Sequence, residues 1–181
     1  MIRKDFKYKT IKNFLTPDEL ILLKDYCIIK HRANETGFDL GQTKGETFIY
    51  GDPVMESLLL NKRKKMQEIT GLKLLPTYAF WRMYIYCSDL KKHTDRPSCE
   101  ISVTVNLGND GTSWPIFMDD TSLNIEPGDA AVYLGETVKH WREPFEGDFQ
   151  AQAFLHYVDL DGPNKNHYKD GRQIWGVNKE T

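Results

Sequence analysis

From Pro76 onward, the chain is a succession of short segments rich in aromatic and β-branched residues, and turn-forming residues separate them. The clearest turns lie at residues 108–111, 127–129 and 146–148, where glycine, proline, asparagine and aspartate supply the conformations that reverse a strand. Short strands at such spacing are typical of a β-sandwich or a jelly roll. We therefore predict a mainly β (α+β) protein whose core begins near residue 76.

One segment of this region, residues 100–107, alternates strictly between apolar and polar side chains. A period of two places Ile101, Val103, Val105 and Leu107 on one face of a strand, and Glu100, Ser102, Thr104 and Asn106 on the other. Small polar side chains on one face indicate either a solvent-exposed surface or the wall of a wet cavity inside a barrel. The motif at residues 93–95, described below, favours the cavity.

Two helices are predicted before the β region. Thr16 is the expected N-cap of the first, with Pro17 at the first helical position and Glu19 completing a capping box. The second begins at residues 52–53 and ends at Gly71. We expect a single domain over residues 1–181, in which helices at about 14–71 brace a β core at about 76–158 and a tail follows at 159–181.

The loop between the two predicted helices and the charge of the chain complete this organisation. Residues 34–51 carry Gly37, Gly41 and Gly45 among polar side chains, which predicts a mobile lid with a strand near residues 47–50. The 24 basic and 26 acidic residues give a net charge of -2, so nothing indicates a nucleic-acid partner beyond the basic run 62–65, which is typical of a solvated helix face. No apolar stretch approaches the roughly 20 residues of a membrane span, and the first residues lack a secretory signal. We expect a cytoplasmic protein that does not bind membranes.

Three side chains have the chemistry of a metal site. His93 and Asp95 are two residues apart, so an extended backbone projects both to the same side. His140 follows 45 residues after Asp95 and can supply a third ligand. Two imidazoles and one carboxylate leave coordination positions open, a donor set that suits iron(II). We interpret His93, Asp95 and His140 as metal ligands and catalytic residues. His156 is interpreted instead as a core or hydrogen-bonded histidine.

The residues around His93 extend this pattern. Tyr84 lies nine residues before His93, and Cys87 and Leu90 lie between them. Together with the segments 95–102, 126–130, 140–144 and 154–157, they resemble in order the motifs of the 2-oxoglutarate- and iron(II)-dependent oxygenase superfamily, which usually has glycine where Cys87 stands. The helix start at residues 16–19 resembles that of the prolyl-hydroxylase-like branch. The resemblance covers about residues 14–161 and implies a double-stranded β-helix, the cupin-like jelly roll.

The resemblance also implies an activity. Members of the superfamily are dioxygenases that use Fe(II) and O2, decarboxylate 2-oxoglutarate to succinate and CO2, and usually hydroxylate a substrate. They commonly bind the far carboxylate of 2-oxoglutarate with a cation about ten residues after the second histidine, but residues 149–152 contain no lysine or arginine. Arg82 shares a strand face with Tyr84, and Arg142 lies two residues after His140. We expect Arg82 and Tyr84 to bind 2-oxoglutarate, with Arg142 as a competing anchor and Gln152 as a neutral partner.

The substrate is less constrained than the cofactor. The prolyl-hydroxylase-like resemblance favours a protein or peptide side chain such as proline, followed by a free amino acid or another small metabolite. Two other classes stay open. One is a cupin-type iron enzyme that uses the same ligands without 2-oxoglutarate, and the other is a noncatalytic jelly-roll binding module.

Overall fold

The computed structural model describes residues 6–33 and 46–177, and its two long helices begin where their N-caps predict. Helix α1 (Pro17–Arg32) starts with the complete capping box, in which the Glu19 backbone N–H donates to the Thr16 hydroxyl at 3.2 Å and the Glu19 carboxylate accepts from the Thr16 N–H at 2.8 Å. Helix α2 (Pro53–Thr70) is capped by Asp52, and Gly71 ends it in the left-handed conformation, with φ of 73°. Both predicted helices are confirmed.

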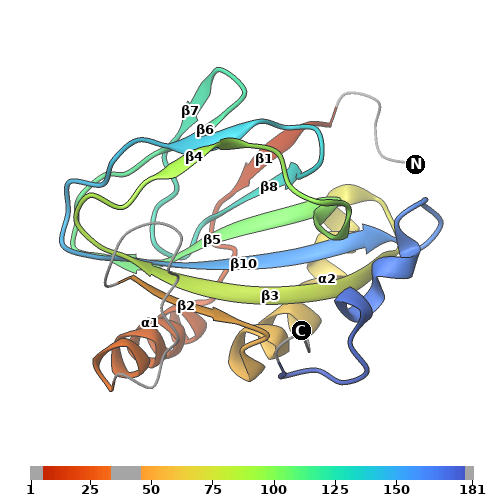
Figure 1. Cartoon of the computed structure of the whole chain (residues 1–181), viewed down its shortest axis with the longest axis horizontal. Coiled ribbons are helices and arrows are strands. Elements are labelled where there is room, and N and C mark those ends of the chain that lie inside the picture. Colours follow the sequence, from red (N-terminus) through yellow and green to blue (C-terminus); the bar gives the residue numbers. More distant parts are fainter. Residues whose placement is uncertain (1–5, 34–45, 178–181) are drawn as a thin grey trace.

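Within the described residues, the strands form two antiparallel sheets (Figure 1). The larger sheet has the strand order β1-β8-β5-β10-β3-β2, and the smaller has the order β4-β9-β6-β7. The strands of the larger sheet are β1 (Tyr8–Ile11), β2 (Thr47–Tyr50), β3 (Leu74–Tyr84), β5 (Ile101–Asn109), β8 (Ala130–Leu134) and β10 (Gln150–Asp159). Those of the smaller are β4 (Leu90–His93), β6 (Ile116–Met118), β7 (Thr121–Leu123) and β9 (His140–Arg142). This mostly antiparallel arrangement confirms the predicted jelly-roll, cupin-like class.

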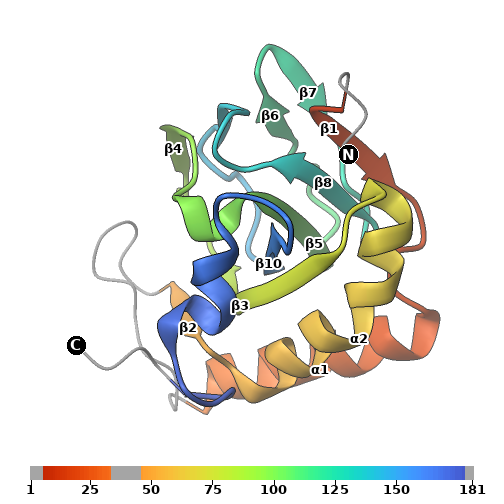
Figure 2. The same cartoon turned by 90° about the vertical axis from the view of Figure 1, so that its right-hand side faces the viewer.

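The larger sheet separates the main apolar core from the inside of the barrel. Figure 2 shows α1 and α2 lying together against one face of the larger sheet, with the smaller sheet on its other side. The predicted apolar face of β5 packs in the core with the helices through Ile101, Val103, Val105 and Leu107. Its polar face, which carries Ser102, Thr104 and Asn106, is equally buried. The polar face therefore lies inside the barrel rather than in solvent, but Ser102, Thr104 and Asn106 are not among the residues that line the cavity described below.

The C-terminal segment packs beside β3 through the 3-10 helix η2 (Lys165–Gly171), which contains the buried Asp170 (Figure 1). Asp170 accepts two hydrogen bonds from Arg96, at 2.9 and 2.7 Å, and one from the Tyr50 hydroxyl at 2.6 Å. Two residues on, Arg172 forms a buried ion pair with Glu56 of α2. Polar contacts with three separate parts of the chain thus hold this segment in place.

Two further features bear on the sequence predictions. The strand expected near residues 47–50 is β2, while residues 34–45 of the predicted lid lie outside the described residues. Cys87, at the turn between β3 and β4, has φ of 67°, the left-handed region that glycine adopts at lowest cost. Among the described helices, none has both the length and the apolar character needed to cross a membrane.

Candidate metal centre and adjoining pocket

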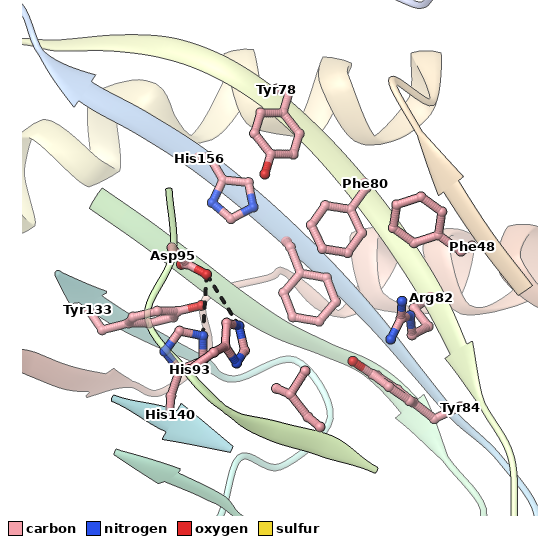
Figure 3. A pocket seen from close by; sticks show the side chains of 12 residues that line it. Phe48, Tyr78, Phe80, Arg82, Tyr84, His93, Asp95, Tyr133, His140 and His156 are labelled. Carbon is pink, nitrogen blue, oxygen red and sulfur yellow. Dashed lines mark ion pairs between the residues drawn. The ribbon is translucent and has the colours of Figure 1, made fainter. Parts of the chain in front are cut away.

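The structure brings His93, Asp95 and His140 together between the two sheets (Figure 3). His93 at the end of β4 is paired with His140 at the start of β9, so strand pairing alone sets the two imidazoles side by side, with ring centroids 4.2 Å apart. Asp95 Oδ1 lies 3.5 Å from Nε2 of each histidine. One potential ligand atom from each of the three residues lies within 4.8 Å of the others.

Backbone carbonyls orient both imidazoles. His93 Nδ1 lies 2.7 Å from the carbonyl oxygen of Lys91, and His140 Nδ1 lies 3.0 Å from that of Val138. Because a carbonyl oxygen only accepts, each Nδ1 donates, and Nε2 of a neutral ring then carries its lone pair toward Asp95. Two imidazole nitrogens and a carboxylate oxygen therefore face one another, a donor set that can hold a cation.

The contacts between Asp95 and the two histidines shift the pKa values of the site. The hydrogen bond with Asp95 raises the pKa of His93, against the opposing effect of burial. Burial by itself would raise the pKa of the Asp95 carboxyl, but hydrogen bonds with His140 and His93 outweigh it and hold that pKa well below its usual range. Asp95 is thus ionised, as a metal ligand must be. Two imidazoles and a carboxylate fit iron(II) with coordination positions left open.

Polar contacts behind Asp95 hold it in this position. The Asp95 backbone N–H donates to the carbonyl oxygen of Gly135 at 2.8 Å. The second carboxylate oxygen, Oδ2, accepts a hydrogen bond from the Ser102 hydroxyl at 2.9 Å. Ser102 comes from the polar face of β5, which explains why a small hydroxyl alternates there with apolar residues.

A cavity of about 210 Å³ adjoins the three residues. Its walls carry mainly aromatic side chains from β3, β10 and β8, together with the three candidate metal ligands and one arginine (Figure 3). The lining residues are Phe48, Tyr78, Phe80, Arg82, Tyr84, Leu90, His93, Asp95, Tyr133, His140, Phe154 and His156. His93 stands at the open side with 39% of its side chain exposed, whereas His140 is 3% exposed. The site is therefore reachable from one side and enclosed on the other.

Two of the four predicted cosubstrate residues lie on this cavity. Arg82 and Tyr84 project from β3 on the same face, and the Arg82 guanidinium lies 5.3 Å from the centre of the Tyr84 ring. Burial raises the pKa of Tyr84, so its hydroxyl keeps its proton and can donate. Arg82 also lies 3.9 Å from the buried Glu46, so an incoming anion has to compete with that carboxylate.

The other two predicted residues are buried outside the lining of the cavity. Arg142 packs over the Trp114 ring at 4.5 Å and donates to the Trp114 carbonyl oxygen, and burial lowers its pKa to about 10. Gln152 donates to the Thr104 hydroxyl at 2.6 Å and accepts from Gln150 at 2.9 Å. Neither side chain is among those that line the cavity, although Arg142 interacts electrostatically with the lining residues Tyr84 and Tyr133.

The sequence prediction did not include the far wall of the cavity. As expected, His156 is buried and hydrogen-bonded, with Nδ1 3.0 Å from the Ser102 hydroxyl oxygen. It also lines the cavity, which the sequence did not predict. Phe154 stacks on Phe80 of β3, with centroids 4.4 Å apart and planes 15° apart. The alternation of Phe154 with His156 on a strand carried this signal, because it places both on one face.

Comparison with known proteins identifies the fold. No family model matches the sequence, and no curated protein matches it. Among solved structures, a Pseudomonas putida prolyl-4-hydroxylase has a TM-score of 0.67 at 17% identity, covering 86% of this chain and 94% of that one. HygX from Streptomyces hygroscopicus, with nickel, 2-oxoglutarate and hygromycin B bound, has a TM-score of 0.66 at 12% identity, covering 86% and 84%.

A third similar structure is the non-heme alpha ketoglutarate dependent epimerase SnoN from nogalamycin biosynthesis. Its TM-score is 0.72 at 11% identity, covering 96% of this chain and 88% of that one. At these identities the likeness shows the fold. The chain thus has the fold of the 2-oxoglutarate- and iron(II)-dependent oxygenases, prolyl-hydroxylase-like members included.

Proposed function

We propose that this chain is a 2-oxoglutarate- and iron(II)-dependent dioxygenase in which His93, Asp95 and His140 hold the metal. The observation that carries the proposal is the convergence of two Nε2 atoms on one carboxylate oxygen, 3.5 Å from each. The fold supports it, since HygX has this fold and binds nickel and 2-oxoglutarate. When bound, iron and 2-oxoglutarate supply the oxidising chemistry, which activates O2 and converts the cosubstrate to succinate and CO2.

The protein's own contribution is orientation, charge and exclusion of water. The carbonyl oxygens of Lys91 and Val138 fix which imidazole nitrogen faces the metal position. Arg82 and Tyr84 supply a positive charge and a hydroxyl donor further along the same cavity, which suits the distal carboxylate of 2-oxoglutarate. The aromatic walls exclude water from the space between them, which strengthens each electrostatic contact inside.

We further propose that the hydroxylated group belongs to a protein or peptide side chain, proline being the first candidate. An aromatic wall suits a compact apolar ring, and the similar Pseudomonas putida structure is a prolyl-4-hydroxylase. A small molecule is the second candidate, because HygX holds hygromycin B in a protein of this fold. Turnover assays with a proline-containing peptide library and with free amino acids, followed by mass spectrometry for a 16 Da gain, separate the two.

The metal and cosubstrate assignments are tested together by anaerobic titration with iron(II). We expect a weak visible charge-transfer band only when iron(II) and 2-oxoglutarate are both present. Iron binding that is indifferent to 2-oxoglutarate would indicate a cupin-type enzyme, which the lack of a cation at residues 149–152 favours, and no iron binding would indicate a noncatalytic module. His93→Ala, Asp95→Ala and His140→Ala should each abolish the band, while His167→Ala on η2 should keep it.

The cosubstrate anchor is tested by a pair of arginine variants. Because a hydrogen bond to a charged group contributes about 1.5–3 kcal/mol, Arg82→Ala should raise the Michaelis constant for 2-oxoglutarate at least tenfold. Arg82→Lys should recover part of this loss. If Arg142→Ala raises the constant and Arg82→Ala does not, Arg142 is the anchor. If neither changes it, both assignments are wrong.

A further inference from the structure

The two oxygens of the Asp95 carboxylate have different surroundings. Oδ1 faces His93 and His140, whereas Oδ2 is turned away from them and accepts the hydrogen bond from Ser102. A carboxylate whose second oxygen is occupied in this way offers one oxygen to a metal. If both oxygens coordinated, the carboxylate would take a position that the bidentate cosubstrate or dioxygen needs.

The proton of the Ser102 hydroxyl has a definite direction because of what surrounds it. The oxygen lies 2.9 Å from Asp95 Oδ2, 3.0 Å from the Cys99 carbonyl oxygen and 3.0 Å from His156 Nδ1. The carboxylate and the carbonyl only accept, so the single hydroxyl proton points to one of them. We assign His156 Nδ1 as the donor to Ser102, because this tautomer leaves the hydroxyl proton of Ser102 for the charged Asp95 carboxylate.

His156 itself has little freedom to turn away from Ser102. Its ring is 3% exposed and packs against Tyr78, with centroids 4.5 Å apart, and against Phe80 at 5.7 Å. Figure 3 shows the ring reaching from β10 toward Asp95. On the other side, the backbone of Gly135 lies so close that an added Cβ would stand 2.6 Å from Asp95 Oδ2 and 2.8 Å from Ser102 Oγ. Asp95 and Ser102 are enclosed from both directions.

A second cation bound by Asp95, Cys99 and His156 is the rival explanation for this cluster, since their ligand atoms lie within 4.8 Å of one another. Burial raises the pKa of the Cys99 thiol to about 12, and its sulfur lies 3.0 Å from the Tyr78 hydroxyl. A protonated thiol is a poor metal ligand. Ser102 also already occupies both Asp95 Oδ2 and His156 Nδ1. The contacts favour a hydrogen-bond chain over a metal site.

We propose that Ser102, held by His156, is a positioning residue that keeps Asp95 as a ligand through one oxygen only. The inference rests on the metal centre under the proposed function and deepens it. The chain runs from the His156 N–H to the Ser102 oxygen and from the Ser102 O–H to Asp95 Oδ2. Hydrogen bonds behind a metal ligand typically alter metal affinity tenfold to a hundredfold when they are removed.

The test is a cobalt(II) titration of the full chain, since the visible spectrum of cobalt reports its coordination number. Ser102→Ala should lower cobalt affinity at least tenfold and change the spectrum. The matched control is Thr104→Val, which removes a buried hydroxyl from the same face of β5 and should change neither. His156→Asn keeps an N–H donor for Ser102 and should stay near wild type, while His156→Leu should behave like Ser102→Ala.

Each result either supports or overturns the positioning role of Ser102. If Ser102→Ala gives the affinity and spectrum of Thr104→Val, the inference is overturned although the metal centre stands. If Ser102→Ala does not fold, the histidine pair decides, and identical spectra for His156→Asn and His156→Leu overturn the inference. If wild type binds no cobalt, or if His93→Ala binds it as well as wild type, the metal centre itself is wrong and the inference falls with it.

Discussion

Gly135 offers the sharpest mutational test of the metal centre, because it is not a ligand and carries no side chain. A Cβ at this position would lie 2.1 Å from the Cys99 carbonyl oxygen, 2.6 Å from Asp95 Oδ2 and 2.8 Å from Ser102 Oγ. All three distances fall below van der Waals contact, and the nearest atom belongs to the backbone. The Gly135 carbonyl also accepts from the Asp95 N–H, so the turn after β8 cannot retreat freely. Gly135→Ala must therefore displace the carboxylate.

The expected magnitude follows from this crowding. Overpacking of a close-packed site typically costs about 1–3 kcal/mol of folding free energy. Displacing Asp95 adds a loss of metal affinity of tenfold or more, comparable to the loss of a hydrogen bond behind a ligand. Denaturant unfolding of the metal-free protein measures the first quantity, and calorimetric titration with cobalt(II) measures the second.

Gly111→Ala is the matched control for this experiment. Gly111 has φ of 98° and nothing within 4 Å of the added Cβ, so alanine there costs roughly 1 kcal/mol through backbone strain alone. It should bind cobalt(II) like wild type despite its lower stability. If Gly135→Ala also keeps wild-type affinity, or if both variants lose affinity in proportion to stability, the close approach of Gly135 has no role in holding Asp95.

Three further predictions concern stability. Burial lowers the pKa of His156 from 6.5 to about 4, so the unfolded chain binds its proton first, and the metal-free protein should lose up to roughly 3 kcal/mol as the pH falls from 6.5 to 4. Denaturant titrations across this range should show that the unfolding free energy of His156→Asn depends less on pH than that of wild type. An equal pH dependence in the two proteins would contradict the lowered pKa of His156. Thr16→Ala removes the N-cap of α1 and should lower the unfolding free energy by about 1 kcal/mol, whereas Ser57→Ala, on the exposed face of α2, should change it little. Glu56→Ala leaves Arg172 buried without its carboxylate and should cost about 3–5 kcal/mol in chemical denaturation, a value that a loss below 1 kcal/mol would refute.

The sequence predicted well the features that depend on neighbours along the chain. The capping box of Thr16 and Glu19 is a local device, and the structure forms it in full. The alternation of residues 100–107 correctly separated an apolar core face from a polar inner face, because strand geometry fixes that pattern. The close approach of His93, Asp95 and His140 was also predicted, from the two-residue spacing of His93 and Asp95 and from the resemblance of the surrounding motifs.

Features set by pairing between distant strands were harder to predict. His156 lines the cavity because β10 pairs with both β3 and β5, which brings it between Tyr78 and Ser102, and a single strand gives no indication of those partners. Arg142 differs from His156 in the opposite direction, because it was predicted to bind the cosubstrate but does not line the cavity. It shares a strand with His140, yet its guanidinium contacts the Trp114 carbonyl and ring and is not among the groups that line the cavity. Side-chain reach on a strand of three residues depends on contacts that the sequence does not display.

The contact between Arg96 and Asp170 links two distant parts of the molecule energetically. Arg96 directly follows Asp95, and its two hydrogen bonds tie the loop that carries Asp95 to the C-terminal segment. Any event that favours the ordered loop must also favour the docked segment, and the reverse holds by the same factor. We therefore expect metal binding at the proposed centre to increase the protection of residues 165–172 from hydrogen exchange, which exchange measurements with and without metal would check.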